Sequence, residues 1–104
     1  MISRLWHGWT TVDNAAAYEQ LLLTTILPGI HRMAGYRGAY VLRRDAEDSV
    51  EFVTITLWES MDAVREFAGD DHAAAVVPPA ARALLTRFDQ TSQHYETILT
   101  PEAG

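Results

Sequence analysis

The stretch from residue 50 to residue 58 limits the fold more than any other part of this sequence. It reads Val-Glu-Phe-Val-Thr-Ile-Thr-Leu-Trp, a run rich in the β-branched and aromatic residues that favour strands. Alternation in a strand would give one face the side chains of Phe52, Thr54, Thr56 and Trp58. The opposite face would carry Val53, Ile55 and Leu57. Because both faces carry bulky groups, we expect a central strand that is buried on both sides.

Two more strands are expected in the first half of the chain. Residues 2–12 are rich in β-branched and aromatic residues and contain no proline. Residues 36–44 would pair with residues 50–58 as a hairpin, because the residues between them are polar and few.

Two helices are expected around this hairpin. Asp13 or Asn14 offers an N-cap for the first helix, and Pro28 should break or kink it. Ser60 would cap the second helix, and Gly69 would end it.

The C-terminal third predicts one more helix and one more strand. A helix would begin near Pro79, where a proline is tolerated in the first turn. Its apolar stripe at helical spacing would be Ala81, Leu84, Leu85 and Phe88. Residues 91–99 alternate between two sets of side chains and are expected to form the last strand.

The predicted order of elements is β-α-β-β-α-(α)-β over a single domain of residues 1–104. Helical crossovers in this order give an α+β, ferredoxin-like βαββαβ fold, a four-stranded antiparallel sheet with helices on one face. The other face must also be covered, since the strand at residues 50–58 is apolar on both sides. The simplest cover is a second copy of the chain, so we expect a homodimer.

Charge and composition exclude several classes of partner. Eight arginines and no lysine stand against fourteen acidic residues, a net charge of −6, so neither nucleic acid nor a membrane is an expected partner. The chain has no cysteine, and we expect no metal site. No apolar run approaches the roughly 18 residues of a membrane span, and residues 1–8 lack a signal-peptide pattern. We therefore expect a cytoplasmic protein.

Three short motifs carry a resemblance to a known family. They are Ala-Gly-Tyr-Arg-Gly at residues 34–38, Thr-Ile-Thr-Leu-Trp-Glu-Ser at residues 54–60, and Phe-Ala at residues 67–68, where the second helix closes. Together with the order of elements, they resemble the antibiotic biosynthesis monooxygenase family over nearly the whole chain. That family belongs to the dimeric α/β-barrel superfamily and includes cofactor-independent oxygenases of polyketide quinols and heme-degrading enzymes.

The resemblance implies roles for particular residues. Trp58 matches the tryptophan that lines the ligand pocket in both kinds of enzyme. Thr54 stands where the oxygenases of aromatic polyketides have an asparagine. Heme is the alternative cofactor, because the heme-degrading members have an iron-ligating histidine after the tryptophan, and His72 lies in a comparable region.

The residues themselves suggest a binding face. Trp58, with Phe52, would form an aromatic wall, and the hydroxyls of Thr54 and Thr56 would orient a planar ligand. The alternative is a tryptophan that belongs to the core. Trp6 on the first strand is a further candidate for the wall.

Two histidines are candidates for proton transfer. His7 follows Trp6, and because neighbours in a strand face opposite ways, only one of the two can enter the pocket. An imidazole with a pKa of about 6.5 suits a general base. His94 shares a strand face with Glu96, whose carboxylate would raise the pKa of the imidazole, and the alternative is a surface or interface hydrogen bond.

The sequence thus predicts a small cofactor-independent, monooxygenase-like enzyme that binds a planar aromatic or polyketide-like molecule between sheet and helices. Because no nucleotide-binding motif is present, the electrons for oxygen would come from an electron-rich substrate. Three alternatives stay open: a cyclase or isomerase with the same pocket, a heme-binding or heme-degrading protein, and a non-catalytic dimeric binding or stress-response module.

Overall fold

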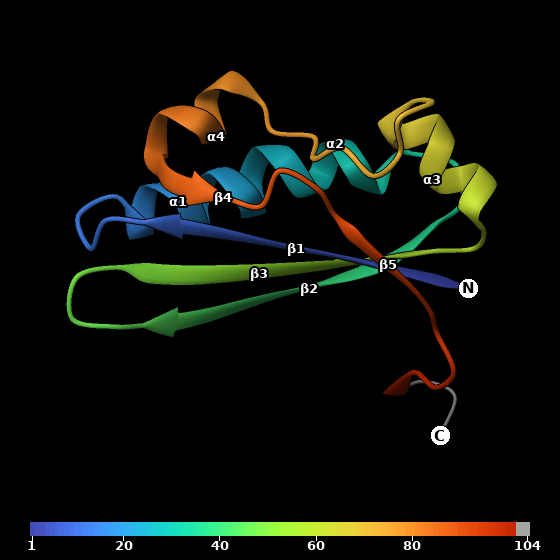
Figure 1. Cartoon of the computed structure of the whole chain (residues 1–104), viewed down its shortest axis with the longest axis horizontal. Helices are drawn as coiled ribbons and strands as arrows, with labels where there is room; N and C mark the ends of the chain where they lie inside the picture. Colours follow the sequence, from blue (N-terminus) through green and yellow to red (C-terminus); the bar gives the residue numbers. More distant parts are fainter. Residues whose placement is uncertain (102–104) are drawn as a thin grey trace.

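The chain folds into one antiparallel sheet with its helices on one face (Figure 1). This computed structural model describes residues 1–101. The strands are β1 (Ile2–Thr10), β2 (Tyr36–Asp45), β3 (Val50–Trp58), β4 (Leu85–Phe88) and β5 (Gln93–Glu96). The helices are α1 (Ala15–Leu21), the π-helical η1 (Leu22–Ile26), α2 (Leu27–His31), α3 (Met61–Ala68) and α4 (Pro79–Leu84). The strand order β2-β3-β1-β4, with β5 also paired to β1, confirms the ferredoxin-like α+β fold with five strands in place of four.

β3 lies in the middle of the sheet between β1 and β2, as the sequence predicts. Its register with β1 places Thr54 opposite Trp6 and Thr56 opposite Arg4. Residues directly opposite each other in a ladder share a face, so these four side chains all lie beneath the helices. His7, the neighbour of Trp6, therefore points to the other face.

The first helix continues through Pro28 to His31, where the sequence predicts a break or a kink. A proline inside an α-helix lacks the N–H and clashes with the carbonyl four residues earlier. Here the turn before Pro28 is the π-helical η1, whose wider hydrogen-bond spacing moves that carbonyl. The helix therefore accommodates the proline without ending.

α3 forms as its sequence predicts. The Ser60 hydroxyl accepts a hydrogen bond from the Ala63 N–H (3.2 Å), and Asp62 lies in the positive first turn. Gly69 follows the last residue with a positive φ of 89°. In the described part of the chain, no helix has the length and apolar character needed to cross a membrane.

The C-terminal third differs from the prediction. The third helix ends at Leu84, and the next four residues pair with β1 as β4. Of the predicted strand at residues 91–99, only Gln93–Glu96 pairs with β1, as β5. The exposed edge of β1 offers backbone hydrogen bonds that outweigh the weak helix preference of four residues. The edge strand is therefore divided into two short strands joined by residues 89–92.

The apolar core is divided into two clusters, one at each end of β3 beneath the helices. One cluster consists of Ala15, Tyr18, Leu22, Val50, Phe52 and Ala81. The other consists of Trp58, Ala63 and Val64. Between them β3 contributes only Thr54 and Thr56, which are much smaller than the aromatic residues on either side. The middle of the layer is therefore left open.

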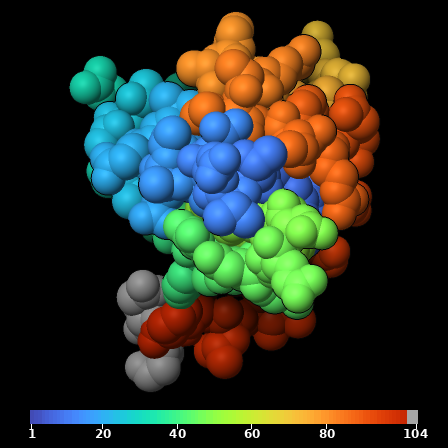
Figure 2. Space-filling model, turned by 90° about the vertical axis from the view of Figure 1, so that its left-hand side faces the viewer, coloured from blue at the N-terminus to red at the C-terminus, as the bar shows by residue number. Residues whose placement is uncertain are grey.

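The sheet face opposite the helices is uncovered in the single chain. Tyr40 and Leu42 of β2 lie on it and are 40% and 48% exposed. Residues 97–101 project beyond this face (Figures 1 and 2). Ile98, among them, is 96% exposed. One chain alone therefore does not bury β3 on both sides, since Val53 and Ile55 remain partly exposed.

Two glycines allow a test of how closely α3 packs on the chain that precedes β2. A Cβ at Gly35 (φ 84°) would lie 2.5 Å from the Ala63 Cβ, whereas a Cβ at Gly69 (φ 89°) would meet nothing within 4 Å. We expect Gly35→Ala to lower the free energy of unfolding by about 2–5 kcal/mol, from backbone strain plus the clash. Gly69→Ala should lower it by about 1–3 kcal/mol, from backbone strain alone. Urea unfolding measures both, and equal losses would contradict this packing.

Candidate functional site

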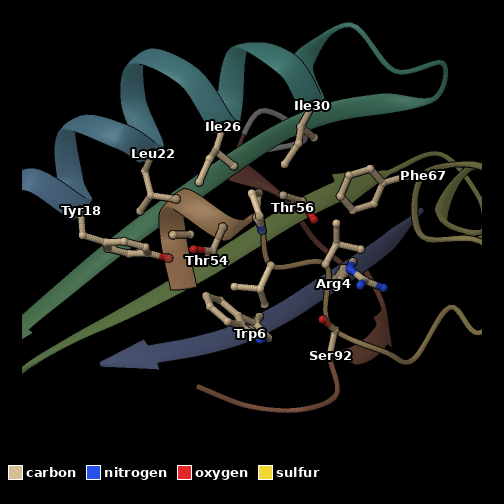
Figure 3. Close-up of a pocket in the computed structure, with 14 residues that line it drawn as sticks. Arg4, Trp6, Tyr18, Leu22, Ile26, Ile30, Thr54, Thr56, Phe67 and Ser92 are labelled. Carbon is tan, nitrogen blue, oxygen red and sulfur yellow. The ribbon is translucent and has the colours of Figure 1, made fainter. Parts of the chain in front are cut away.

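A cavity occupies the gap between the two core clusters, with β1 and β3 on one side and the first helix on the other (Figure 3). The space inside it that a water-sized molecule can occupy is about 70 Å³, within a hollow of about 540 Å³ that includes open solvent. Its walls are mostly apolar. The lining residues are Arg4, Trp6, Tyr18, Leu22, Ile26, Ile30, Thr54, Thr56, Phe67, Val76, Val77, Pro78, Ala81 and Ser92.

Arg4 is the charged residue of this lining, and it is only 5% exposed. Its Nη1 donates hydrogen bonds to the His72 carbonyl and to His94 Nε2 (2.8 Å), and its Nη2 donates to the Ala74 carbonyl (3.1 Å). The guanidinium carbon lies 5.7 Å from the centre of the Phe67 ring. Among residues 1–101, no carboxylate pairs with this cation. Burial lowers the pKa of Arg4, but an arginine stays protonated in proteins.

His94 is held as a neutral acceptor by this contact. Because a guanidinium only donates, His94 Nε2 must carry no proton when it binds Arg4. Burial, and then the charges of Arg4 and His72, lower the pKa of His94. The expectation that Glu96 raises this pKa is therefore wrong, and among the described residues Arg4 is the side chain that His94 hydrogen-bonds. His94 is not available as a base for a ligand in the cavity.

Hydroxyl groups supply the other polar atoms of the cavity (Figure 3). Burial raises the pKa of Tyr18 to about 12, so its phenol stays protonated and can donate a hydrogen bond. Thr54 Oγ1 is buried and has no hydrogen-bond partner among residues 1–101, which is costly unless a ligand supplies one. Thr56 Oγ1 accepts a hydrogen bond from Trp58 Nε1 (2.8 Å). Both threonines lie where the sequence places them, on the floor of the cavity.

Trp58 and Phe52 belong to the core and do not line the cavity, which corrects the expected aromatic wall. Trp58 is fully buried and stacks on Phe67 with ring centres 5.1 Å apart. Phe52 is also fully buried and packs edge-on against Tyr18. The aromatic walls are instead Phe67, Tyr18 and Trp6. Trp58 supports the cavity indirectly, because it stacks on Phe67, which lines it.

His7 lies on the opposite face of the sheet and cannot reach the cavity, so its expected role as a base there is wrong. Its Nδ1 is 2.7 Å from an Asp89 carboxylate oxygen, and its Nε2 is 4.0 Å from a Glu51 oxygen. Its ring stacks on Trp9. Trp6, its neighbour, is the one that faces the cavity, and Trp6 Nε1 donates to the Asp89 carbonyl (2.7 Å).

His72 does not line the cavity either. Its carbonyl accepts from Arg4, and its ring packs against His94 with centres 5.5 Å apart. The described lining contains no histidine, so these donors do not fit a heme iron held by an imidazole. Residues 1–101 also contain no group of three or more His, Asp or Glu side chains placed to bind a metal ion.

Sequence reasoning missed three polar residues of the site, Arg4, Tyr18 and Ser92. Arg4 had a signal, since alternation along β1 places it between Ile2 and Trp6 on the covered face. Tyr18 was visible as part of an apolar helical stripe, but the stripe does not reveal that its hydroxyl faces a cavity. Ser92 gave no signal, because its place depends on the loop that joins β4 to β5.

Comparison with known proteins agrees with this architecture. The model of a family described as antibiotic biosynthesis monooxygenase matches residues 8–79. SnoaB, a cofactor-independent oxygenase from Streptomyces nogalater, has a similar structure with a TM-score of 0.63 and 24% identity, covering 96% of each chain. The heme-degrader MhuD from Mycobacterium tuberculosis, with two hemes bound in its active site, has a TM-score of 0.61 and 17% identity, covering 96% of this chain and 98% of its own. A search of curated proteins finds no significant match.

The lowered pKa of His94 predicts how stability depends on pH. The folded-state pKa lies below the ordinary value of 6.5, so on acidification the unfolded chain takes up this proton first. The contribution of His94 to stability is therefore complete above pH 6.5 and is lost as the pH falls below that value through the folded pKa. The variant His94→Gln keeps a hydrogen-bond acceptor for Arg4 but cannot take up this proton. We therefore expect its free energy of unfolding, measured with urea, to fall less than that of the wild type as the pH falls below 6.5.

The matched control is His31→Gln, since His31 lies at the exposed end of α2. This variant should lose more stability on acidification than His94→Gln, because it keeps His94. If all three proteins lose the same stability on acidification, His94 does not carry the effect.

Proposed function

Because this chain belongs to the antibiotic biosynthesis monooxygenase family, we propose that it is a small enzyme that oxygenates a planar aromatic or polyketide-like substrate without a cofactor. The observation that carries this proposal is the cavity between the two core clusters. Trp6 and Phe67 offer flat apolar surfaces to a ring system, and few polar groups converge on the same space.

The proposed reaction takes its electrons from the substrate. A ring CH₂ activated by a neighbouring phenol oxygen would be converted to a ring carbonyl by O₂. One oxygen atom enters the substrate, and the other leaves as water with the two hydrogens of the CH₂ group. Such a ring is most electron-rich as an anion, so the site has to favour the ionised substrate and exclude water.

The residues of the cavity suit these tasks. Leu22, Ile26 and Ile30 cover the space with apolar side chains and keep water out. The Tyr18 phenol, held protonated, would donate to a substrate oxygen. Thr54 Oγ1 would gain the hydrogen-bond partner that it lacks in residues 1–101. Binding would thus be specific at one ring edge and apolar over the ring faces.

Heme is the alternative cofactor, and the donors of the cavity argue against it because none of the described residues brings an imidazole into this space. A second function, a non-catalytic binding module, is favoured by one specific observation. The described lining contains no carboxylate and no imidazole, so it contains no conventional general base. Oxygen uptake separates this module from the proposed enzyme.

The protein would act as a homodimer formed through the uncovered face of the sheet. Tyr40, Leu42 and Tyr95 are exposed apolar or aromatic side chains on this face. Ile98 and Leu99, 96% and 76% exposed, project beyond it and would pack on the second copy. A second copy would complete the burial of β3 that its two apolar faces require.

Blocking the cavity should abolish function. Val76 is 49% exposed and lines both the cavity and an apolar groove outside it, whereas Val12, 54% exposed, lies in the turn between β1 and α1. We expect Val76→Trp to lower the rate of oxygen uptake with a dihydroxyanthrone by about tenfold or more, as 1.4 kcal/mol of lost binding would. The matched variant Val12→Trp should keep the wild-type rate.

An oxygen electrode measures the rates, and an unchanged Tm shows that both variants are folded. Equal rates in the two variants would contradict a reaction in this cavity. Saturable binding of the dihydroxyanthrone without oxygen uptake in the wild type would favour the binding module.

The dimer is tested on the sheet face itself. Leu42 of β2 and Leu23 of η1 are similarly exposed, at 48% and 52%, but only Leu42 lies on the uncovered face. Leu42→Glu should shift the mass measured by light scattering from that of a dimer to that of a monomer, because it places a charge in an apolar contact. Leu23→Glu should remain a dimer. A monomeric wild type would overturn the proposed assembly.

A further inference from the structure

The cavity holds a positive charge that the described chain does not neutralise. Arg4 is only 5% exposed, yet its partners are two carbonyls and a neutral imidazole. By contrast, arginines that form ion pairs with carboxylates lie at the surface: Arg37, Arg43, Arg44 and Arg65. The chain has a net charge of −6, so acidic side chains are plentiful. None of those in residues 1–101 pairs with the one arginine that burial makes costly.

A buried cation of this kind calls for an anion. Removing a guanidinium from water is costly unless a counter-charge and hydrogen bonds replace the solvent. Carbonyl oxygens and an imidazole solvate the charge but do not cancel it. An arginine has five N–H donors, and the three hydrogen bonds of Arg4 leave two donors for a ligand.

The surroundings hold Arg4 in one orientation at one end of the cavity. The His72 carbonyl binds Nη1 of the guanidinium, and the Ala74 carbonyl binds Nη2. The Phe67 ring lies 5.7 Å from its carbon atom. Ser92 lines the same end, as Figure 3 shows, and is 5% exposed. An oxyanion placed here would meet a pre-oriented cation and a nearby hydroxyl, and a ring attached to it would extend between Trp6 and the first helix.

We propose that the ligand of this cavity is an aromatic oxyanion, a carboxylate or a phenolate, and that Arg4 is the residue that binds its charged oxygen. This inference rests on the proposed function, because it places the charge on the planar substrate assigned there. It also accounts for the lack of a base in the described lining. A phenol beside a buried cation ionises more readily, so the substrate can bind as its anion without giving a proton to the protein.

The first experiment compares matched pairs of probes on the wild-type protein. One pair is naphthoate and its neutral analogue naphthamide. The other is a nitronaphthol that is ionised at neutral pH and its methyl ether. Quenching of tryptophan fluorescence measures each affinity, because Trp6 lines the cavity. We expect the anion of at least one pair to bind about tenfold or more tighter than its neutral analogue, as charge-assisted hydrogen bonds are the stronger kind. The pair in which the anion binds more tightly than its neutral analogue shows whether the cavity prefers a carboxylate or a phenolate.

The second experiment tests Arg4 directly. Arg4→Gln should remove the preference for the anion and leave the affinity for the neutral analogue nearly unchanged. Arg37→Gln is the matched control, since Arg37 pairs with Glu59 at the surface and should keep the wild-type preference. The inference would be overturned if Arg4→Gln still preferred the anion, or if the wild type bound both members of each pair equally. Either result would leave the aromatic cavity intact. Failure of all four probes to bind would overturn the aromatic cavity as well.

A readout on the wild type covers the case in which Arg4→Gln does not fold. Burial lowers the pKa of His94, and the charges of Arg4 and His72 lower it further. An anion bound at Arg4 would offset this positive charge, so the imidazole should titrate at higher pH in the complex. The NMR titration of the His94 ring measures the shift with saturating anion and with its neutral analogue. An equal titration in both complexes would contradict an anion bound at Arg4.

Discussion

The helix-covered face of the sheet has large side chains at its two ends and threonines in its middle. Phe52 and Trp58 pack against the helices at either end of β3, and each anchors a separate core cluster. Thr54 and Thr56 between them cannot reach the helices, so the layer stays open there. The fold therefore obtains its stability from the two ends and its cavity from the middle. The core and the site are two results of one alternating sequence pattern.

The buried charge of Arg4 gives this cavity its chemical character. Its guanidinium is oriented by backbone carbonyls and by Phe67, which Trp58 in turn supports from behind. Burial, together with this charge, lowers the pKa of His94, and the Arg4 guanidinium occupies the acceptor nitrogen of the imidazole. The polar network at this end of the cavity is thus arranged around a cation that is ready for an anionic partner. In the account proposed here, Arg4 stabilises the ionised substrate, and the apolar walls exclude water from the electron-rich ring.

Local sequence patterns predicted the helices and strands that form because of their own residues and caps. The strand at residues 50–58 has the predicted bounds, and the helix that follows begins at the cap of Ser60. The C-terminal third could not be predicted in this way, because β4 and β5 exist through pairing with β1 at the other end of the chain. The site could not be predicted for the same reason, because its residues lie far apart in the sequence. Arg4 binds His94, 90 positions later, so a pattern that placed His94 beside Glu96 assigned it the wrong partner and the wrong direction of pKa shift.

A crystal structure of the protein with naphthoate bound tests most directly whether Arg4 binds the charged oxygen of the ligand. We expect the ring to lie between the sheet and the first helix, against Trp6 and Phe67, with a carboxylate oxygen within hydrogen-bond distance of the Arg4 guanidinium. A ring bound elsewhere, or a carboxylate turned toward solvent while Arg4 contacts only its carbonyls and His94, would contradict this expectation.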